Sequence, residues 1–305
     1  MGTVYFLLLL SVFVWSALYQ WSLLLIYFTI LFIYYFLSLK YEQKKHNTPS
    51  KKFKAAVYDA SASGFWKIKF HIDTSYADAF LAEFNKKNPD LMLSYTHIGL
   101  KALANALLAG NNNFAKINFG SLVPLESPTI STIVNIKDKN LTMIPVKDVD
   151  KKGIVDIRKS LKNIVKTTKL GKNKDVNMMK QVFRFMSPII VRLIADVLVF
   201  VIYSLDITIN KAFTKEHFGT AVLTNVSNMY VMDSFLKAQN EVRNSVLLSM
   251  NRPVYRGVVD ESGEIQIRKI MVVNASLEAR VYDILDSKEL GEAFKSVWRN
   301  PDKYL

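Results

Sequence analysis

The first forty residues constrain the fold most, because residues 3–39 include no charged side chain. The run Val4–Leu39 is far longer than the apolar core of a signal peptide, and no soluble core encloses so long an uncharged helix. About 20 residues cross the hydrocarbon core of a bilayer. We therefore predict a transmembrane anchor over residues 1–39, formed by one long tilted helix or by a short hairpin that bends near Tyr19–Ser22. The single helix is the arrangement that we favour.

The residues after this run predict its orientation. The N-terminal side of the run offers only the terminal amine. The residues after it include a cluster of lysines, namely Lys40, Lys44, Lys45, Lys51, Lys52 and Lys54. Cytoplasmic flanks of membrane spans are enriched in Lys and Arg. We therefore expect the rest of the chain on the cytoplasmic face of a membrane, or on the organellar equivalent. We interpret residues 40–55 as a basic linker and residues 56–305 as one folded domain, with the lipid bilayer as a partner.

The sequence of this domain mixes strand and helix signals without strict alternation. In Trp66–Asp73 apolar and polar residues alternate, as in a half-buried strand. Residues 153–168 place apolar side chains on one face of a helix. Further helices are expected at 75–87, 95–109 and 288–298, and further strands at 130–136, 141–145 and 264–273. Such a mixture predicts an α/β or α+β layered domain.

Residues 182–209 form an unusually apolar segment within the domain. Val197–Tyr203 is an unbroken apolar run, but Arg192 and Asp196 lie one helical turn apart just before it. These charges argue against a second membrane span. We expect a core helix or a surface-lying amphipathic helix. Because the domain is expected to be attached to a membrane, a surface-lying helix could contact the same bilayer.

Six segments of the chain follow one another in a recognisable order. They are Trp66–Asp73, Tyr95–Leu108, Ser131–Asp148 (STIVNIKDKNLTMIPVKD), residues 150–165 (DKKGIVDIRKSLKNIV), Gly219–Asn225 (GTAVLTN) and Gly263–Tyr282 (GEIQIRKIMVVNASLEARVY). Together they resemble the catalytic domain of the 2-oxoacid dehydrogenase acyltransferases, a fold shared with chloramphenicol acetyltransferase. The resemblance implies an α/β, chloramphenicol acetyltransferase-like layer of sheet and helices preceded by the transmembrane segment. It also implies a homotrimer whose active sites lie between neighbouring subunits.

The same resemblance identifies the site positions and one important departure. The family carries His-x-x-x-Asp/Asn, with the histidine as general base, and the matching stretch here begins at Ala279 and ends at Asp283. Alanine has no proton acceptor, Asp283 matches a structural charge partner, and Ile284 replaces the family glycine. Thr224 matches the hydroxyl residue that stabilises the oxyanion. A threonine that simply belongs to a strand is the alternative reading of Thr224.

Four histidines are available to replace the missing base. His46 lies in the linker, His71 on the polar face of a strand, and His97 in a helix that would have to face the acyl channel. His217, three residues before Thr220, is the one near a matched motif. We therefore name His217 as the candidate substitute.

Other chemistries find little support in the sequence. The chain has no cysteine, which excludes disulfides and thiolate nucleophiles, and we find no zinc-ligand spacing, phosphate loop or Gly-x-Ser-x-Gly elbow. The lysines of residues 151–180 follow helical spacing without interleaved aromatics, which favours a solvated face or anionic lipid over nucleic acid. No metal site is expected.

Taken together, these features predict a membrane-anchored, catalytically degenerate protein of acyltransferase fold that acts as a trimeric binding or scaffold module. One alternative is an active acyltransferase at the membrane surface that uses a coenzyme A thioester. The other is a structural subunit with protein partners in a larger membrane complex.

Overall fold

The computed structural model describes residues 10–15, 17–18, 21–40, 64–110, 115–118, 121–124, 129–135, 141–169, 194, 196–205, 207–209, 218–237, 243–259 and 262–305. Nearly all of the expected basic linker, much of the apolar segment 182–209, His46 and His217 lie outside the described residues.

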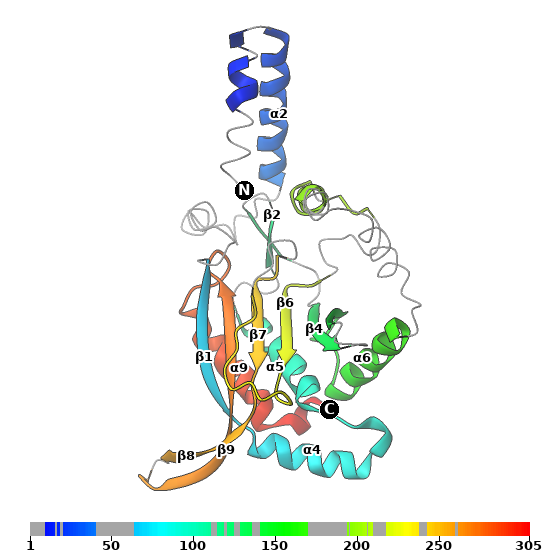
Figure 1. The fold of residues 1–305 in the computed structure, drawn as a ribbon, viewed down its shortest axis with the longest axis vertical. Coiled ribbons are helices and arrows are strands. Elements are labelled where there is room, and N and C mark those ends of the chain that lie inside the picture. Colours follow the sequence, from blue (N-terminus) through cyan, green and yellow to red (C-terminus); the bar gives the residue numbers. More distant parts are fainter. Residues whose placement is uncertain are drawn as a thin grey trace.

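The apolar N-terminus folds back on itself beside helix α2 (Trp21–Lys40), at one end of the molecule (Figure 1). The ring of Phe13 lies 5.2 Å from that of Tyr27 and 6.4 Å from that of Phe28. In one continuous helix, residues 13 and 27 would be about 21 Å apart along the axis. Of the two arrangements that the sequence leaves open, the structure therefore has the hairpin and not the single helix. Within the described residues, no helix combines the length and the apolar character needed to cross a membrane.

A mixed sheet forms the centre of the domain. Its order is β1 (Phe65–Asp73), β9 (Ile265–Glu278), β7 (Val246–Met250), β6 (Ala221–Asn225), β4 (Ile130–Asn135) and β5 (Leu141–Val146). Strands β4, β6 and β7 run parallel, and the other pairs are antiparallel. Strand β8 (Val254–Val259) pairs with the first half of β9, and this hairpin, which we call the arm, projects from the sheet (Figure 1). A separate ladder joins β2 (Ala115–Asn118) to β3 (Ser121–Pro124).

Helices cover one face of this sheet. They are α4 (Ser75–Lys87), α5 (Tyr95–Ala109), α6 (Ile154–Lys169) and α9 (Asp286–Arg299), with short 3-10 turns at Pro89–Leu91 and Pro301–Tyr304. Alternate residues of β1, including Phe70 and Ile72, point into the core that the sheet forms with α9. On α9 the apolar side chains recur at helical spacing, and Phe294 packs edge-on against Phe70. The expected mixed α/β layered fold is thus confirmed.

The described part of the apolar segment is half-buried. Residues Phe200–Ser204 form a π-helical turn, in which Ile202 and Tyr203 are buried whereas Phe200 is exposed. The Tyr203 ring lies 5.1 Å from the Lys116 ammonium and 5.2 Å from the Arg243 guanidinium. These contacts attach the segment to β2. Contact with a bilayer stays a prediction.

Candidate functional site

A row of polar residues crosses the sheet face opposite the helices. Register pairing aligns Thr224 of β6 with Ser249 of β7, Ser249 with Asn274 of β9, and Asn274 with Lys69 of β1. Their neighbours in sequence, apart from the polar Asn225, belong to the apolar core on the helix side or pack against it. These four side chains therefore lie on the other face of the sheet. We call this row Thr224–Ser249–Asn274–Lys69 the polar row.

The loop 231–236 covers most of the polar row. Asp233 pairs with Lys69 and accepts a hydrogen bond from Asn274. These two interactions hold the pKa of the Asp233 carboxyl below its usual value. The Ser234 hydroxyl lies 2.7 Å from the Ser249 hydroxyl. The loop therefore contacts three of the four residues through polar groups, and the Oδ1 of Asn274 stays buried without a hydrogen-bond partner among the described residues.

Thr224 is the member of the polar row that this loop leaves uncommitted. Its side chain is buried, yet its hydroxyl makes no hydrogen bond anywhere in the part of the chain that the structure describes. A hydroxyl that no protein group engages can donate a hydrogen bond to a ligand oxygen. The position suits the hydrogen-bond donor that the sequence predicts there, and that role stays a prediction.

The position of the missing base lies directly after β9. Ala279 is buried, and its backbone N–H donates to the carbonyl oxygen of Gly64 at 2.8 Å. On either side of it, Glu278 and Arg280 form a buried ion pair. Burial raises the pKa of the Glu278 carboxyl, although the guanidinium of Arg280 opposes the shift. Sequence reasoning missed Glu278, a carboxylate adjacent to the lost histidine, and the structure shows it bound to Arg280.

Asp283 lies in the turn that leads from β9 into α9. Its backbone N–H donates to a carboxylate oxygen of Asp286 at 2.6 Å, at the start of the helix. Ile284, in place of the family glycine, is exposed. The structure therefore places Asp283 in a helix-entry turn, close to Ala279 along the chain.

Thr224 and Ala279 do not meet within one chain. Thr224 is level with Asn274 across the sheet, and Ala279 lies five residues beyond Asn274. At about 3.3 Å per residue this amounts to about 17 Å along the strand direction. Within one chain, the Thr224 hydroxyl and the position of the base are therefore too far apart to form a complete acyl-transfer site.

The described histidines lie in the wrong places to serve Thr224. His97 is buried on α5, on the helix side of the sheet, where its Nδ1 accepts a hydrogen bond from the Ser94 backbone N–H at 2.9 Å. Burial, together with the nearby charge of Arg158, lowers the pKa of His97 to about 4. His71 is exposed on β1. His97 therefore acts as a helix cap and is not aimed at the polar row.

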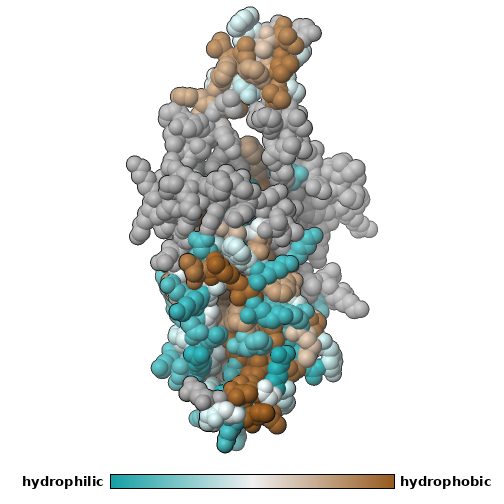
Figure 2. All heavy atoms as spheres, turned by 90° about the vertical axis from the view of Figure 1, so that its left-hand side faces the viewer, coloured by the Kyte–Doolittle hydropathy of each residue, from teal (hydrophilic) through white to brown (hydrophobic). Residues whose placement is uncertain are grey.

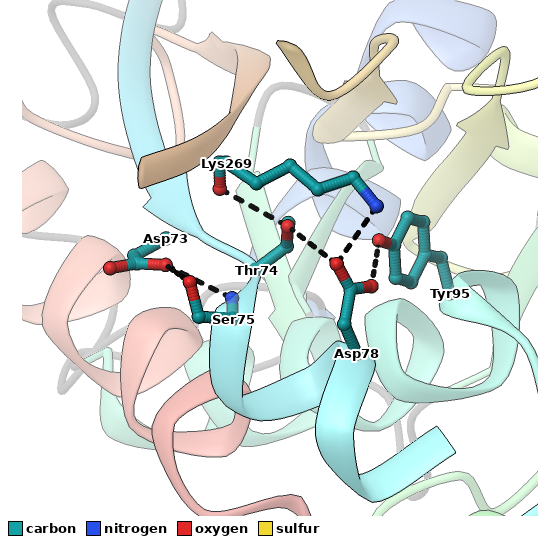
Figure 3. Close-up of polar contacts among 6 residues, drawn as sticks. All are labelled: Asp73, Thr74, Ser75, Asp78, Tyr95 and Lys269. Atoms are coloured by element: carbon teal, nitrogen blue, oxygen red, sulfur yellow. Dashed lines mark hydrogen bonds and ion pairs between the residues drawn. The ribbon is translucent and has the colours of Figure 1, made fainter. Parts of the chain in front are cut away.

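A second polar cluster lies where β1 runs into α4. The Asp78 carboxylate accepts hydrogen bonds from Tyr95 and Thr74 and pairs with Lys269 at 2.9 Å (Figure 3). Asp78 is thereby fully engaged by groups from α4, α5 and β9. This saturation favours a structural role, since no group in the cluster is left to attack or deprotonate a substrate.

The described residues contain no group of three or more His, Cys, Asp or Glu side chains that could hold a metal ion. No known family model matches the chain, and no curated protein matches it. Solved structures do match. A probable dihydrolipoamide acetyltransferase from Listeria monocytogenes 4b F2365 is 16% identical, with a TM-score of 0.56 over 77% of this chain and 83% of that chain.

Two further structures match over 84% of this chain and 88% of theirs, each with 10% identity and a TM-score of 0.58. One is the cubic core of the pyruvate dehydrogenase multienzyme complex, and the other is the dihydrolipoamide acetyltransferase of Azotobacter vinelandii. At these identities the likeness concerns the fold. The domain has the fold of the acyltransferase cores of 2-oxoacid dehydrogenase complexes, as the sequence resemblance implies.

Proposed function

We propose that this protein is a membrane-anchored member of the acyltransferase fold that has lost acyl-transfer catalysis and acts as a trimeric binding or scaffold module. The observation that carries the proposal is Ala279. The catalytic mechanism of the Azotobacter vinelandii enzyme has been investigated at a serine, a histidine and an asparagine. By the sequence resemblance to the family, the corresponding positions here are Thr224, Ala279 and Asp283, so the imidazole is the group that is absent. General-base catalysis contributes about 10²–10⁴-fold to a rate.

The surroundings of Ala279 supply no evident replacement. The nearest carboxylate in sequence, Glu278, is buried, and its Oε1 is held by the guanidinium of Arg280. His97 caps a helix on the other side of the sheet. These arrangements support a degenerate site.

The separation of the two site positions supports the proposal of a trimer. If Thr224 and Ala279 still face a common ligand, they must do so across a subunit boundary. The solved relative described as a cubic core is itself a multimer, which supports self-association of this fold. We propose a homotrimer in which Thr224 of one chain approaches Ala279 of the next.

Membrane attachment is proposed from the charge-free N-terminus and its flank. Trp21, Leu25 and Phe32 of α2 expose more than half of their surface, which suits a lipid environment better than water. The following lysines favour a cytoplasmic location of the domain, or the organellar equivalent. Protease added outside sealed vesicles whose cytoplasmic face is exposed should digest the domain, and protection there would contradict this orientation.

A second function is favoured by the free hydroxyl of Thr224. A hydrogen-bond donor that no protein group engages is what an oxyanion needs, so an active acyltransferase that uses a coenzyme A thioester is the alternative. In that case the base would come from a residue outside the matched motif, and His217 is the first candidate.

One assay separates the two functions. Release of free coenzyme A from a panel of acyl-coenzyme A donors is measured for the wild type, Ala279→His and Thr224→Ala, with thiol and alcohol acceptors. We expect no turnover above background by the wild type. We expect Ala279→His to stay inactive as well, because Ile284 replaces the glycine that follows the motif. Robust wild-type turnover that disappears in Thr224→Ala would overturn the proposal.

A further inference from the structure

A cleft of about 560 Å³ lies where β1 ends and the arm leaves the sheet. Its volume falls within the range of about 300–1,000 Å³ that is typical of small-molecule sites. Ile72, Ile270 and Trp298 provide buried apolar surface in its lining, and the exposed ring of Tyr76 stands at its edge. The cleft is separate from Thr224 and Ala279, neither of which lines it.

The charged side chains of the cleft are mostly cationic. Arg268, Lys295 and Arg299 line it, and Asp73 is the one carboxylate among the lining residues. Asp73 pairs with Arg268 at 3.4 Å. Lys295 and Arg299 share a single carboxylate, Glu292, at 3.1 and 3.7 Å. The two cations of α9 are therefore only half neutralised.

The arm adds an unpaired charge beside these. Arg256 of β8 lies directly opposite Arg268 of β9, on the face of the arm that carries Val258 to the cleft. Like charges directly opposite each other destabilise an antiparallel pair. Arg256 makes no hydrogen bond or ion pair with any other residue in the described ranges. The four cations with their two carboxylates leave a net charge of +2 at this place.

The wall of the cleft is rigidly held. The Asp73 carboxylate accepts hydrogen bonds from the backbone N–H of Ser75 at 3.0 Å and from its hydroxyl at 2.6 Å (Figure 3). Burial alone would raise the pKa of Asp73, but these bonds and the charge of Arg268 lower it. Lys269, the neighbour of Arg268, is tied to Asp78. The base of the arm is therefore fixed, so that Arg268 stays at the cleft without a ligand.

We infer that this cleft binds a soluble organic phosphate monoester. A phosphate monoester carries about −1.5 to −2 charges at pH 7, which matches the net charge of the four cations and two carboxylates. Guanidinium groups bind phosphate oxygens in a bidentate manner. The organic part of the ligand would lie on Ile72, Ile270 and Trp298. The arm and the end of β1, which contribute residues to the cleft, lie at the opposite end of the molecule from the apolar hairpin (Figure 1). This position favours a soluble ester over a headgroup of the bilayer that holds the hairpin.

Phenyl phosphate is the probe that tests this inference, with the full chain in detergent micelles and binding followed by titration calorimetry. We expect saturable binding of one phenyl phosphate per chain, competition by inorganic phosphate, and no binding of phenol. Arg256→Gln and Arg268→Gln should each weaken binding about tenfold, the effect of losing one charge-assisted contact. Lys166→Gln removes an exposed cation from α6, far from the cleft, and should bind as the wild type does.

Two outcomes would overturn the inference: absence of saturable binding, or an equal loss of affinity in Lys166→Gln, which would indicate unspecific attraction to a basic protein. The Arg256 side chain makes no hydrogen bond or ion pair with the described residues, so its replacement removes no such interaction among them. Arg268→Gln breaks the pair with Asp73, and its melting temperature is therefore measured beside its affinity. No step of the inference uses Ala279, so its failure would leave the proposed function untouched.

Discussion

The backbone around Ala279 is held by contacts that need no imidazole. Its N–H bonds Gly64, and the flanking Glu278–Arg280 pair is buried. Removing one partner of a buried pair is costly, because the other charge stays buried and uncompensated. Selection for folding alone can therefore preserve the conformation at the end of β9. Because these contacts do not involve a histidine, the loss of the base does not remove them.

His97 contributes to the dependence of stability on pH between 7 and 5. Its native pKa of about 4 lies below the value of about 6.5 for an unfolded histidine. As the pH falls below about 6.5, the unfolded chain takes up a proton that the native chain refuses, so stability is lost with falling pH. Between pH 6.5 and 5 this amounts to about 2 kcal/mol at about 1.4 kcal/mol per pH unit.

The variant His97→Asn tests this dependence. An asparagine oxygen can still accept the Ser94 N–H, but it does not titrate. We expect the free energy of unfolding of the variant to fall by about 2 kcal/mol less than that of the wild type between pH 7.5 and 5, as measured by urea denaturation. His71→Asn, at an exposed position of β1, serves as the control and should keep the wild-type response. Identical pH profiles for His97→Asn and wild type would rule out His97 as the source.

At the scale of elements, the sequence pattern predicted those helices and strands that bury only one of their faces. The alternation in Trp66–Asp73 corresponds to β1, and the helix expected at 288–298 lies within α9. Strand β7 was not predicted, because Val246–Met250 is buried on both faces and has no period. The polar row was not predictable either, since its members come from four strands whose register is set by tertiary packing. Thr224 was found only through the resemblance of GTAVLTN, and the separation of Thr224 from Ala279 required the sheet register.

The Asp78 cluster joins three elements, and its loss should loosen them together. Asp78→Ala removes the acceptor for Tyr95, Lys269 and Thr74 at the junction of α4, α5 and β9. We expect the free energy of unfolding to fall by about 2–4 kcal/mol, because partly buried donors lose their partner. Glu83→Ala is the matched control on the same helix, where the pair with Lys87 is exposed to solvent and contributes little to stability. Equal effects of the two substitutions would show that the cluster is not a stabilising junction.

On the scale of the whole molecule, apolar surface gathers at both ends. The hairpin lies at one end, and the tip of the arm exposes Val259, Ile265 and Ile267 at the other. Figure 2, which shows the side with β1 and the arm, has brown side chains at the bottom of the described surface and in a stripe between teal ones above it. Both ends therefore offer contacts beyond the single chain, with the basic cleft beside the arm.

The proposed trimer can be tested because the chain has no cysteine. In the double variant Thr224→Cys, Ala279→Cys the two thiols lie about 17 Å or more apart within one chain by the strand rise, beyond the reach of a short bismaleimide. If Thr224 of one subunit approaches Ala279 of the next, the reagent closes a ring of three chains. We expect a covalent trimer on denaturing gels after treatment in mild detergent. Each single variant is the control and should give no covalent trimer, because each chain then offers one thiol. Monomers alone from the double variant, in a preparation that light scattering shows to be monomeric, would remove both the trimer and the site between its subunits.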